Sequence, residues 1–400
     1  PVGSDAGDHW EDIRKGLNDF ATEVLAAGFN AVTLDDVAHL TDHPWYENEV
    51  RERIGYFSDR FEELIDDLLQ RELRVYVTSD VVTMTKAISR KTKGCREKQR
   101  EFYFEILERF FVRFPGVEGV ILRVGESDGL DVHDDLRSEL HLRSPKEGNG
   151  FLKELLPRME AAGKTVILRT WTVGAYRLGD LIWHRGALGK MLEGISSEKF
   201  ILSMKPGDSD FFRYLPLNKA FFRYEGKKVL ELQARPEYEG AGELPTFLGY
   251  QYSRYAEELE GVKNLVGVSV WCQTGGWHRF RRLAFFDEGS PWVENNARVA
   301  LGIFAHGESL ATSIPEGAEF FELLDRVIRE VFYIRPFAEQ KLFFRRVRIP
   351  PLLHVYWDTV FLIAPVRKLM RFFVTDHEAA LKEGEEAMKV LPKMLELVDE

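Results

Sequence analysis

The chain has 400 residues, of which 44% are hydrophobic and 30% charged, so it can bury a large core and is neither intrinsically disordered nor a disulfide-stapled small protein. The chain has 54 Lys and Arg residues and 65 Asp and Glu residues. The resulting net charge of -11 argues against sequence-independent binding to nucleic-acid phosphates. Cys95 and Cys272 belong to no CxxC or Cys/His cluster, so neither a disulfide framework nor a zinc site is expected.

No segment is long and apolar enough to predict a transmembrane helix. The most apolar stretch, residues 355–363, contains Asp358 and is followed by Pro365, whereas a spanning helix requires about 20 residues. No apolar run follows Pro1, so no signal peptide is expected in this chain, and the compartment stays open.

Short β-branched runs recur along the first three quarters of the chain and predict seven strands. They span residues 30–34, 73–78, 119–123, 165–169, 200–204, 229–233 and 266–270. Between them lie stripes at i, i+3, i+4 spacing that predict amphipathic helices, one from Phe57 to Leu69 and one from Tyr103 to Phe111.

This alternation predicts an α/β fold, a (β/α)8 TIM barrel over residues 1–314. The first strand is not evident, because residues 1–8 supply no apolar run. A doubly wound nucleotide-binding sheet is the competing architecture, but no strand is followed by GxGxxG or GxxxxGK[ST].

Residues 315–400 are expected to form a C-terminal helical region. Its aromatic and basic middle has three open interpretations: it packs on the barrel through Arg stems, it forms a homodimer interface, or it is a membrane-surface patch. The aromatic residues concerned are Phe343, Phe344, Tyr356, Trp357, Phe361, Phe372 and Phe373.

Polar and aromatic residues follow the predicted strands, at the end of a barrel where active sites lie. In chain order they are Asp35, Asp36, Ser79, Asp80, Arg123, Glu126, Arg169, Trp171, Lys205, Asp210, Arg235, Glu237, Trp271, Trp277 and His278. Asp35 and Asp36 either bind substrate hydroxyls or cap the following helix, and Asp80 has the same ambiguity.

Carboxylates without a Cys/His cluster are typical of glycoside hydrolysis, in which one acid protonates the leaving oxygen and another carboxylate activates water or attacks the sugar. Indoles suit the apolar face of a sugar. Arg169 and Lys205 indicate an anionic group on that sugar, since a guanidinium holds a carboxylate through two hydrogen bonds. No cofactor or metal is expected.

Two segments resemble the microbial xylan α-glucuronidase family of glycoside hydrolases. Residues 204–211, MKPGDSDF, match the family's MK-x-G-x-x-DF segment, and residues 233–240, QARPEYEG, match its Q-x-x-x-EY-x-G segment. Weaker echoes are Gly125-Glu126, Arg169, and Trp277 with residues 282–284. The resemblance covers the catalytic barrel part, roughly residues 10–310, without the family's amino-terminal β-sandwich.

The resemblance implies an exo-acting, inverting enzyme that removes an α-glucuronic acid-like sugar from an oligo- or polysaccharide. Glu126 becomes the general acid, Asp210 and Glu237 position and deprotonate the water, and Lys205 and Arg169 contact the uronate carboxylate. The other predicted substrate-binding residues are Asp35, Asp36, Arg123, Trp171, Trp271, Trp277 and His278.

Three alternatives stay open. A sibling glycosidase acting on another sugar is one, because Glu126 is followed by Ser127-Asp128 rather than the family's Gly- and Pro-rich loop. A non-catalytic carbohydrate-binding barrel is another, although such a barrel does not need a water-activating pair. A metal-assisted hydrolase is the third, disfavoured by the lack of clustered histidines.

Overall fold

The structure is a computed structural model that describes residues 9–125, 135–170, 184–207, 213–236, 245–272, 291–313, 317–332, 342–344, 347–349 and 377–398, with Leu178, Leu181, Ile182, Phe211, Glu239 and Gly242. The chain divides into two compact units. The first comprises Pro1–Met204 and Gly226–Lys228, and the second comprises Lys205–Glu225 and Val229–Glu400.

Parallel strands form the sheet of the first unit. Their order is β1 (Ala31–Leu34), β2 (Arg74–Asp80), β4 (Gly119–Arg123), β6 (Thr165–Arg169) and β7 (Phe200–Met204). Each coincides with a predicted run to within two residues. Val, Ile and Leu dominate these strands because a parallel strand is covered on both faces.

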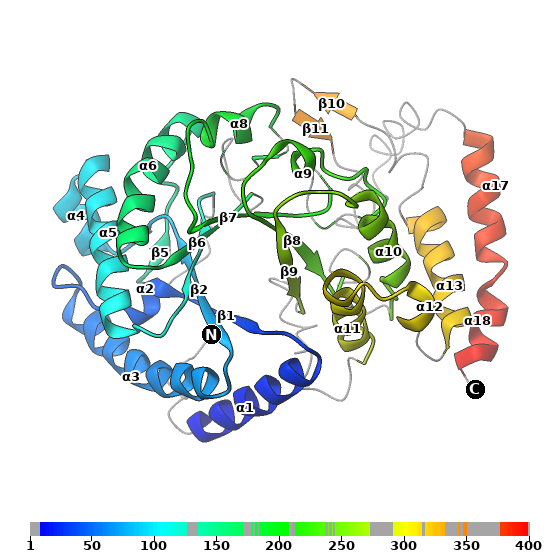
Figure 1. The fold of residues 1–400 in the computed structure, drawn as a ribbon, viewed down its shortest axis with the longest axis horizontal. Coiled ribbons are helices and arrows are strands. Elements are labelled where there is room, and N and C mark those ends of the chain that lie inside the picture. Colours follow the sequence, from blue (N-terminus) through cyan, green and yellow to red (C-terminus); the bar gives the residue numbers. More distant parts are fainter. Residues whose placement is uncertain are drawn as a thin grey trace. The chain divides into compact units, whose positions relative to one another are not determined.

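Helices of the first unit cover the outer face of this sheet, where α3 contacts β2 and α6 contacts β6 (Figure 1). The helices are α1 (Trp10–Ala26), α2 (Val37–Leu40), α3 (Asn48–Gln70), α4 (Lys86–Thr92), α5 (Arg96–Arg113), α6 (Pro145–Ala161) and α8 (Ala187–Met191). The predicted apolar stripe of α5 is buried from Tyr103 to Phe111. Two short strands, β3 (Thr83–Met84) and β5 (Arg137–Ser138), pair antiparallel after β2.

The two faces of the sheet differ in chemistry. The face toward the helices is apolar and fully buried, as at Val77, Leu122 and Leu168. Its last residue on β2, Ser79, lies 2.9 Å from the hydroxyl of Tyr103 on α5, which identifies this face as the helix-covered one. Alternate residues project from the opposite, inner face, because side chains in a strand alternate.

The last two predicted strands are β8 (Lys228–Gln233) and β9 (Leu265–Trp271). Both belong to the second unit, except that Lys228, the first residue of β8, belongs to the first. Ala234, just after β8, donates a backbone hydrogen bond of 2.8 Å to the carbonyl oxygen of Trp271. The helices are α9 (Ala220–Arg223), α10 (Gly249–Glu258), α11 (Pro291–His306), α12 (Leu310–Ser313), α13 (Ala318–Val327), a π-helical turn η4 (Ile328–Phe332), α17 (His377–Met388) and α18 (Leu391–Val398).

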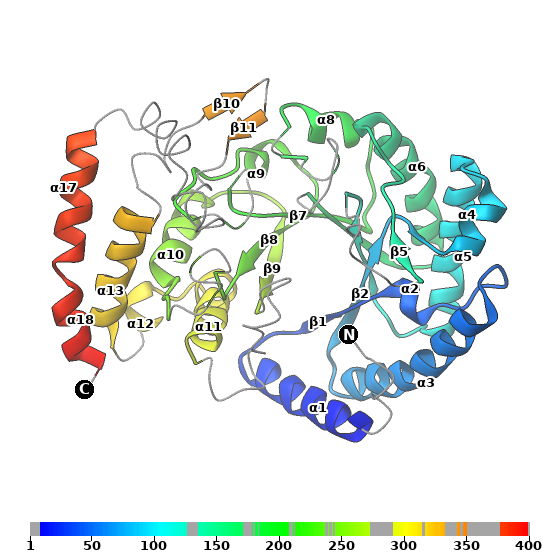
Figure 2. The same cartoon turned by 180° about the vertical axis from the view of Figure 1, so that it is seen from behind.

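The C-terminal region is helical over most of its described residues, and α13 lies beside α17 and α18 (Figure 2). One part differs from the expectation of helix. Strands β10 (Leu342–Phe344) and β11 (Val347–Ile349) form an antiparallel hairpin in which Phe343 faces Arg348. Aromatic and β-branched residue types, of which Phe343, Phe344 and Val347 are examples, favour extended backbone over helix.

Seven strands thus appear in the predicted order, with helices between them in the chain, which is the α/β pattern of TIM-type folds. Residues 1–8, where the missing first strand was sought, lie outside the described residues. Of the helices described, none combines the length and apolar character needed to cross a membrane.

Candidate active site

Four side chains form a row across the inner face of the first unit's sheet, at the carboxyl ends of its strands. The register pairs Asp80 with Arg123 and Arg169 with Ser203, and the pairing of Leu122 with Leu168 sets Arg123 beside Arg169. Paired residues of parallel strands project from the same face. We call Asp80, Arg123, Arg169 and Ser203 the polar row; it lies where a TIM-type fold binds substrate.

Asp80 and Arg123 form a nearly buried ion pair at one end of the polar row. The guanidinium Nε of Arg123 donates to Oδ1 of Asp80 at 2.5 Å, and the Ser138 hydroxyl on β5 donates to Oδ2. Burial raises the pKa of Asp80, although Arg123 and Ser138 oppose the change. Asp80 therefore fixes the orientation of the Arg123 guanidinium. The contact between Arg123 and substrate stays a prediction.

Asp35 and Asp36 are adjacent in the chain but have different partners. Asp35 continues the inner face of β1 and accepts a hydrogen bond from the Thr78 hydroxyl of β2. Asp36 is the N-cap of α2 and accepts from the backbone N–H of His39 at 3.0 Å and its Nδ1 at 2.8 Å. Burial raises the pKa of Asp36, but the His39 hydrogen bonds outweigh it and the pKa lies below its ordinary value. The capping alternative thus describes Asp36, and its contact with substrate stays a prediction.

The two cations predicted to bind a uronate are both buried. Arg169 is the last residue of β6 and only 8% exposed, on the inner face. Lys205 follows β7, is 5% exposed, and places its Nζ 3.8 Å from the centre of the Phe211 ring. A cation over an aromatic face is stabilised by the ring quadrupole, so Phe211 orients the Lys205 ammonium.

The end of β8 carries a second set of polar residues that alternate with apolar ones. Glu231 is 2% exposed, Gln233 is 8% exposed and Arg235 is fully buried, while Leu230, Leu232 and Ala234 form the other face. The Nε of Arg235 donates to the carbonyl oxygen of Gly242 at 3.0 Å. Arg235 therefore holds the segment after β8, and Trp271 ends the neighbouring segment β9, half-buried.

Six predicted site residues lie outside the described residues. They are the catalytic candidates Glu126, Asp210 and Glu237 and the substrate-binding candidates Trp171, Trp277 and His278. Their roles stay predictions. Ser138, Ser203 and Glu231 are not among the site residues predicted from the sequence. For Glu231, the period-2 alternation of polar and apolar residues in LELQAR was the signal that could have identified it.

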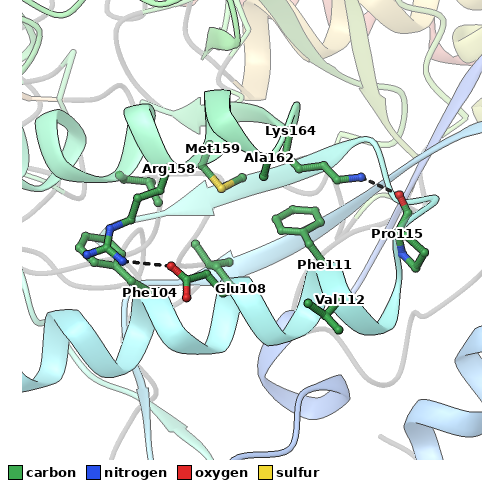
Figure 3. Close-up of a pocket in the computed structure, with 11 residues that line it drawn as sticks. Phe104, Glu108, Phe111, Val112, Pro115, Arg158, Met159, Ala162 and Lys164 are labelled. Atoms are coloured by element: carbon green, nitrogen blue, oxygen red, sulfur yellow. Dashed lines mark hydrogen bonds and ion pairs between the residues drawn. The ribbon is translucent and has the colours of Figure 1, made fainter.

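A groove of about 470 Å³ lies between α5 and α6, on the outer side of the first unit (Figure 3). Phe104, Phe111 and Met159 line it. Its charged groups are paired locally: Arg158 donates to Glu108 at 3.0 Å, and Lys164 donates to the carbonyl oxygen of Pro115 at 2.6 Å. The groove lies on the helical side rather than at the carboxyl ends of the strands, so it is not the candidate site.

Within the part of the chain that the structure describes, no three His, Cys, Asp or Glu side chains gather in a way that could hold a metal ion. The described polar groups are carboxylates, guanidinium groups, an ammonium and hydroxyls. Such groups bind hydroxyl-rich and anionic ligands by charge-assisted hydrogen bonds.

No protein-family model matches the chain, and no curated protein matches it in sequence. Among solved structures, a GH138 enzyme targeting pectin rhamnogalacturonan II matches with a TM-score of 0.50 at 12% identity. The match covers 79% of this chain but 39% of the enzyme, so the chain spans about two fifths of that enzyme's length. The shared feature is the TIM-type α/β fold.

Two further structures are less similar. An O-GlcNAc hydrolase from Thermobaculum terrenum has a TM-score of 0.45 at 12% identity, with 96% of this chain and 73% of that chain covered. A D-psicose 3-epimerase from Clostridium cellulolyticum H10 has a TM-score of 0.41 at 12% identity, with 72% and 92% covered.

Proposed function

We propose that this protein is a glycoside hydrolase that releases a uronic acid, or a related acidic sugar, from an oligo- or polysaccharide. Glu126 is the general acid, and Asp210 and Glu237 activate the attacking water in an inverting displacement. Arg169 and Lys205 bind the sugar carboxylate, and Asp35, Asp36, Arg123, Trp171, Trp271, Trp277 and His278 contact the remaining sugar surface.

The observation that carries the proposal is the polar row at the carboxyl ends of the strands. The inner face is apolar deeper in the sheet, at Ile121, Ile167 and Ile201, and becomes polar one pleat later, at Arg123, Arg169 and Ser203. A buried guanidinium and a hydroxyl at this level suit a ligand with both a carboxylate and hydroxyl groups. The GH138 match in fold and the two motif segments support the same class of reaction.

A panel of aryl glycosides and oligosaccharides, uronic and neutral, tests the proposal when the product anomer is resolved by NMR. Release of a uronic acid with inverted configuration is the expected result. A matched Asp210→Asn protein controls for contaminating activity. Turnover of neutral sugars alone would favour the sibling glycosidase, and sugar binding without turnover would favour the carbohydrate-binding barrel.

A further inference from the structure

The chain after β7 is anchored on the C-terminal helices of the second unit by an apolar cluster. Leu215, Leu324, Val327, Ile328 and Met394 are its buried members, and Phe211 and Tyr214 pack against them. These residues come from the segment after β7, from α13, from η4 and from α18. We call this set the α13 cluster.

A buried ion network lies beside the α13 cluster. Arg213 donates from Nη1 to both carboxylate oxygens of Glu239, at 3.3 and 3.1 Å, and from Nε to Gln251 at 3.1 Å. Its Nη2 donates to Asp325 on α13. The side chains of Arg213 and Glu239 are 4% and 1% exposed, so this bridge has little competition from water.

Tyr214 holds the same segment in an uncommon backbone conformation. Its φ is +63°, a left-handed value that costs a residue with a Cβ conformational energy. Its hydroxyl donates to Oδ1 of Asp325 at 2.9 Å. Asp325 therefore accepts hydrogen bonds from two consecutive residues, Arg213 and Tyr214, and fixes the course of the chain there.

The anchored segments are the ones that carry the predicted chemistry. Asp210 precedes Arg213 by three residues in the chain, and Glu237 precedes Glu239 by two. Phe211, which packs against the α13 cluster, also lies against the ammonium of Lys205. A bridge between Arg213 and Glu239 thus ties together the segments after β7 and β8, and Asp325 ties both to α13.

We propose that α13 is the platform that positions the catalytic segments, with Arg213, Glu239 and Asp325 as positioning residues for Asp210 and Glu237. The inference rests on the proposed function. It assigns the C-terminal helix α13 a role in positioning segments of its own unit, the second one. Asp325 sets the location of Arg213, which sets the spacing of the two segments. Small displacements of catalytic groups lower kcat by about 100-fold.

The test uses the full chain with Asp325→Ala, Asp325→Asn and the control Glu319→Gln. Removing Arg213 would leave two buried carboxylates uncompensated, so the variants are made at Asp325, which is 13% exposed. Asp325→Asn keeps an acceptor oxygen for Arg213 and Tyr214. Glu319 lies on α13, as Asp325 does, but its exposed ion pair is with Lys393 of α18 and involves neither segment.

The first measurement is backbone hydrogen exchange without substrate. In Asp325→Ala, exchange should accelerate in residues 205–218 and 234–248, and Asp325→Asn should show a smaller effect. Glu319→Gln should match the wild type. Exchange unchanged by Asp325→Ala in both segments would overturn the anchoring role.

The second measurement separates kcat from KM, at a temperature well below the unfolding midpoint of every variant. Asp325→Ala should lower kcat by about 100-fold with a smaller change in KM, and Asp325→Asn should restore part of it. A lower unfolding midpoint with unchanged kcat would mean that the network is only structural, and would overturn the proposal. If the wild type hydrolyses no glycoside, the proposed function fails, and the exchange measurement alone decides the anchoring role.

Discussion

At the scale of single residues, partners decide what neighbouring acids do. Asp35 and Asp36 are neighbours in the chain but have different partners. Asp35 accepts a hydrogen bond from the Thr78 hydroxyl on the inner face of the sheet, and Asp36 caps the helix α2. Asp80 is held by Arg123 and Ser138, so it orients a cation instead of presenting a free carboxylate. These local bonds fix the orientation of each carboxylate independently of any substrate.

The general-acid role predicts a dependence on the leaving group. Glu126→Gln should lower turnover of natural glycosides by about 10²- to 10⁴-fold, because the leaving oxygen is no longer protonated. A substrate with an acidic phenol leaving group needs little protonation and should lose much less. Asp210→Asn is the comparison, since loss of water activation should slow both substrates alike. Equal losses on both substrates in Glu126→Gln would remove Glu126 from this role.

The uronate-binding role predicts a change in selectivity. Arg169→Ala and Lys205→Ala should each weaken transition-state binding of an acidic sugar by about 1.5 to 3 kcal/mol relative to its neutral counterpart. The observable is the ratio of kcat/KM for the two substrates. Arg113→Ala, which breaks ion pairs with Asp59 and Glu62 on the outer helices, should leave the ratio unchanged. A constant ratio in both site variants would leave the uronate hypothesis without support.

At the scale of elements, the packing between helices of the first unit includes a titratable contact. His141, before α6, is 7% exposed, and its Nδ1 lies 3.1 Å from Oε1 of Gln99 on α5. Burial, together with the nearby positive charges of Arg96 and Arg100, lowers the pKa of His141 to about 4. The histidine is thus neutral in the folded protein across most of the acidic range.

This contact predicts a pH dependence of stability. Below pH 6.5 His141 is protonated in the unfolded chain, whereas in the folded protein it stays neutral down to about pH 4. The free energy of unfolding therefore falls as the pH falls from 6.5 to 4. The loss should approach roughly 2 to 3 kcal/mol near pH 4.5. Native-state hydrogen exchange in α5 and α6 measures it, and His141→Asn should show a correspondingly shallower dependence. Identical profiles for the two proteins would contradict the assignment.

At the scale of the whole molecule, the chain consists of two compact units, and the C-terminal helices α13, α17 and α18 belong with β8 and β9. The predicted boundary at residue 314 stays a prediction. So does the homodimer through the aromatic C-terminal region, since the side chains of the seven aromatic residues named for it lie outside the described ones.

The dimer hypothesis predicts an effect of concentration on mass. Analytical ultracentrifugation should give about twice 46.2 kDa at micromolar concentration. Replacing Phe372 and Phe373 by Ser should shift the protein to the monomer, because apolar interface cores drive such association. Val112→Ser, which removes an 83% exposed apolar side chain from α5, should leave the mass unchanged. A monomeric wild type at all concentrations would exclude this interface.

The sequence by itself determined where the strands of the α/β fold begin and end, since β-branched runs bounded by polar residues are a local signal. It also determined that Arg169 and Lys205 lie at the carboxyl ends of strands, because the end of a run is visible in the chain. It did not predict the β10–β11 hairpin, which lies within residues 315–400, where a helical region is expected. Periodicity identifies regular, partly buried elements and says little about short local pairings.

Only the tertiary structure decided which polar groups meet. Register across four strands brings Asp80, Arg123, Arg169 and Ser203 to one level, and a shift of one residue would turn each to the helix-covered face. Arg213 and Asp325 are 112 residues apart in the chain, and no local pattern connects them. Their pairing follows from the packing of α13 against the segment after β7, which is a long-range contact that spacing in the sequence does not encode.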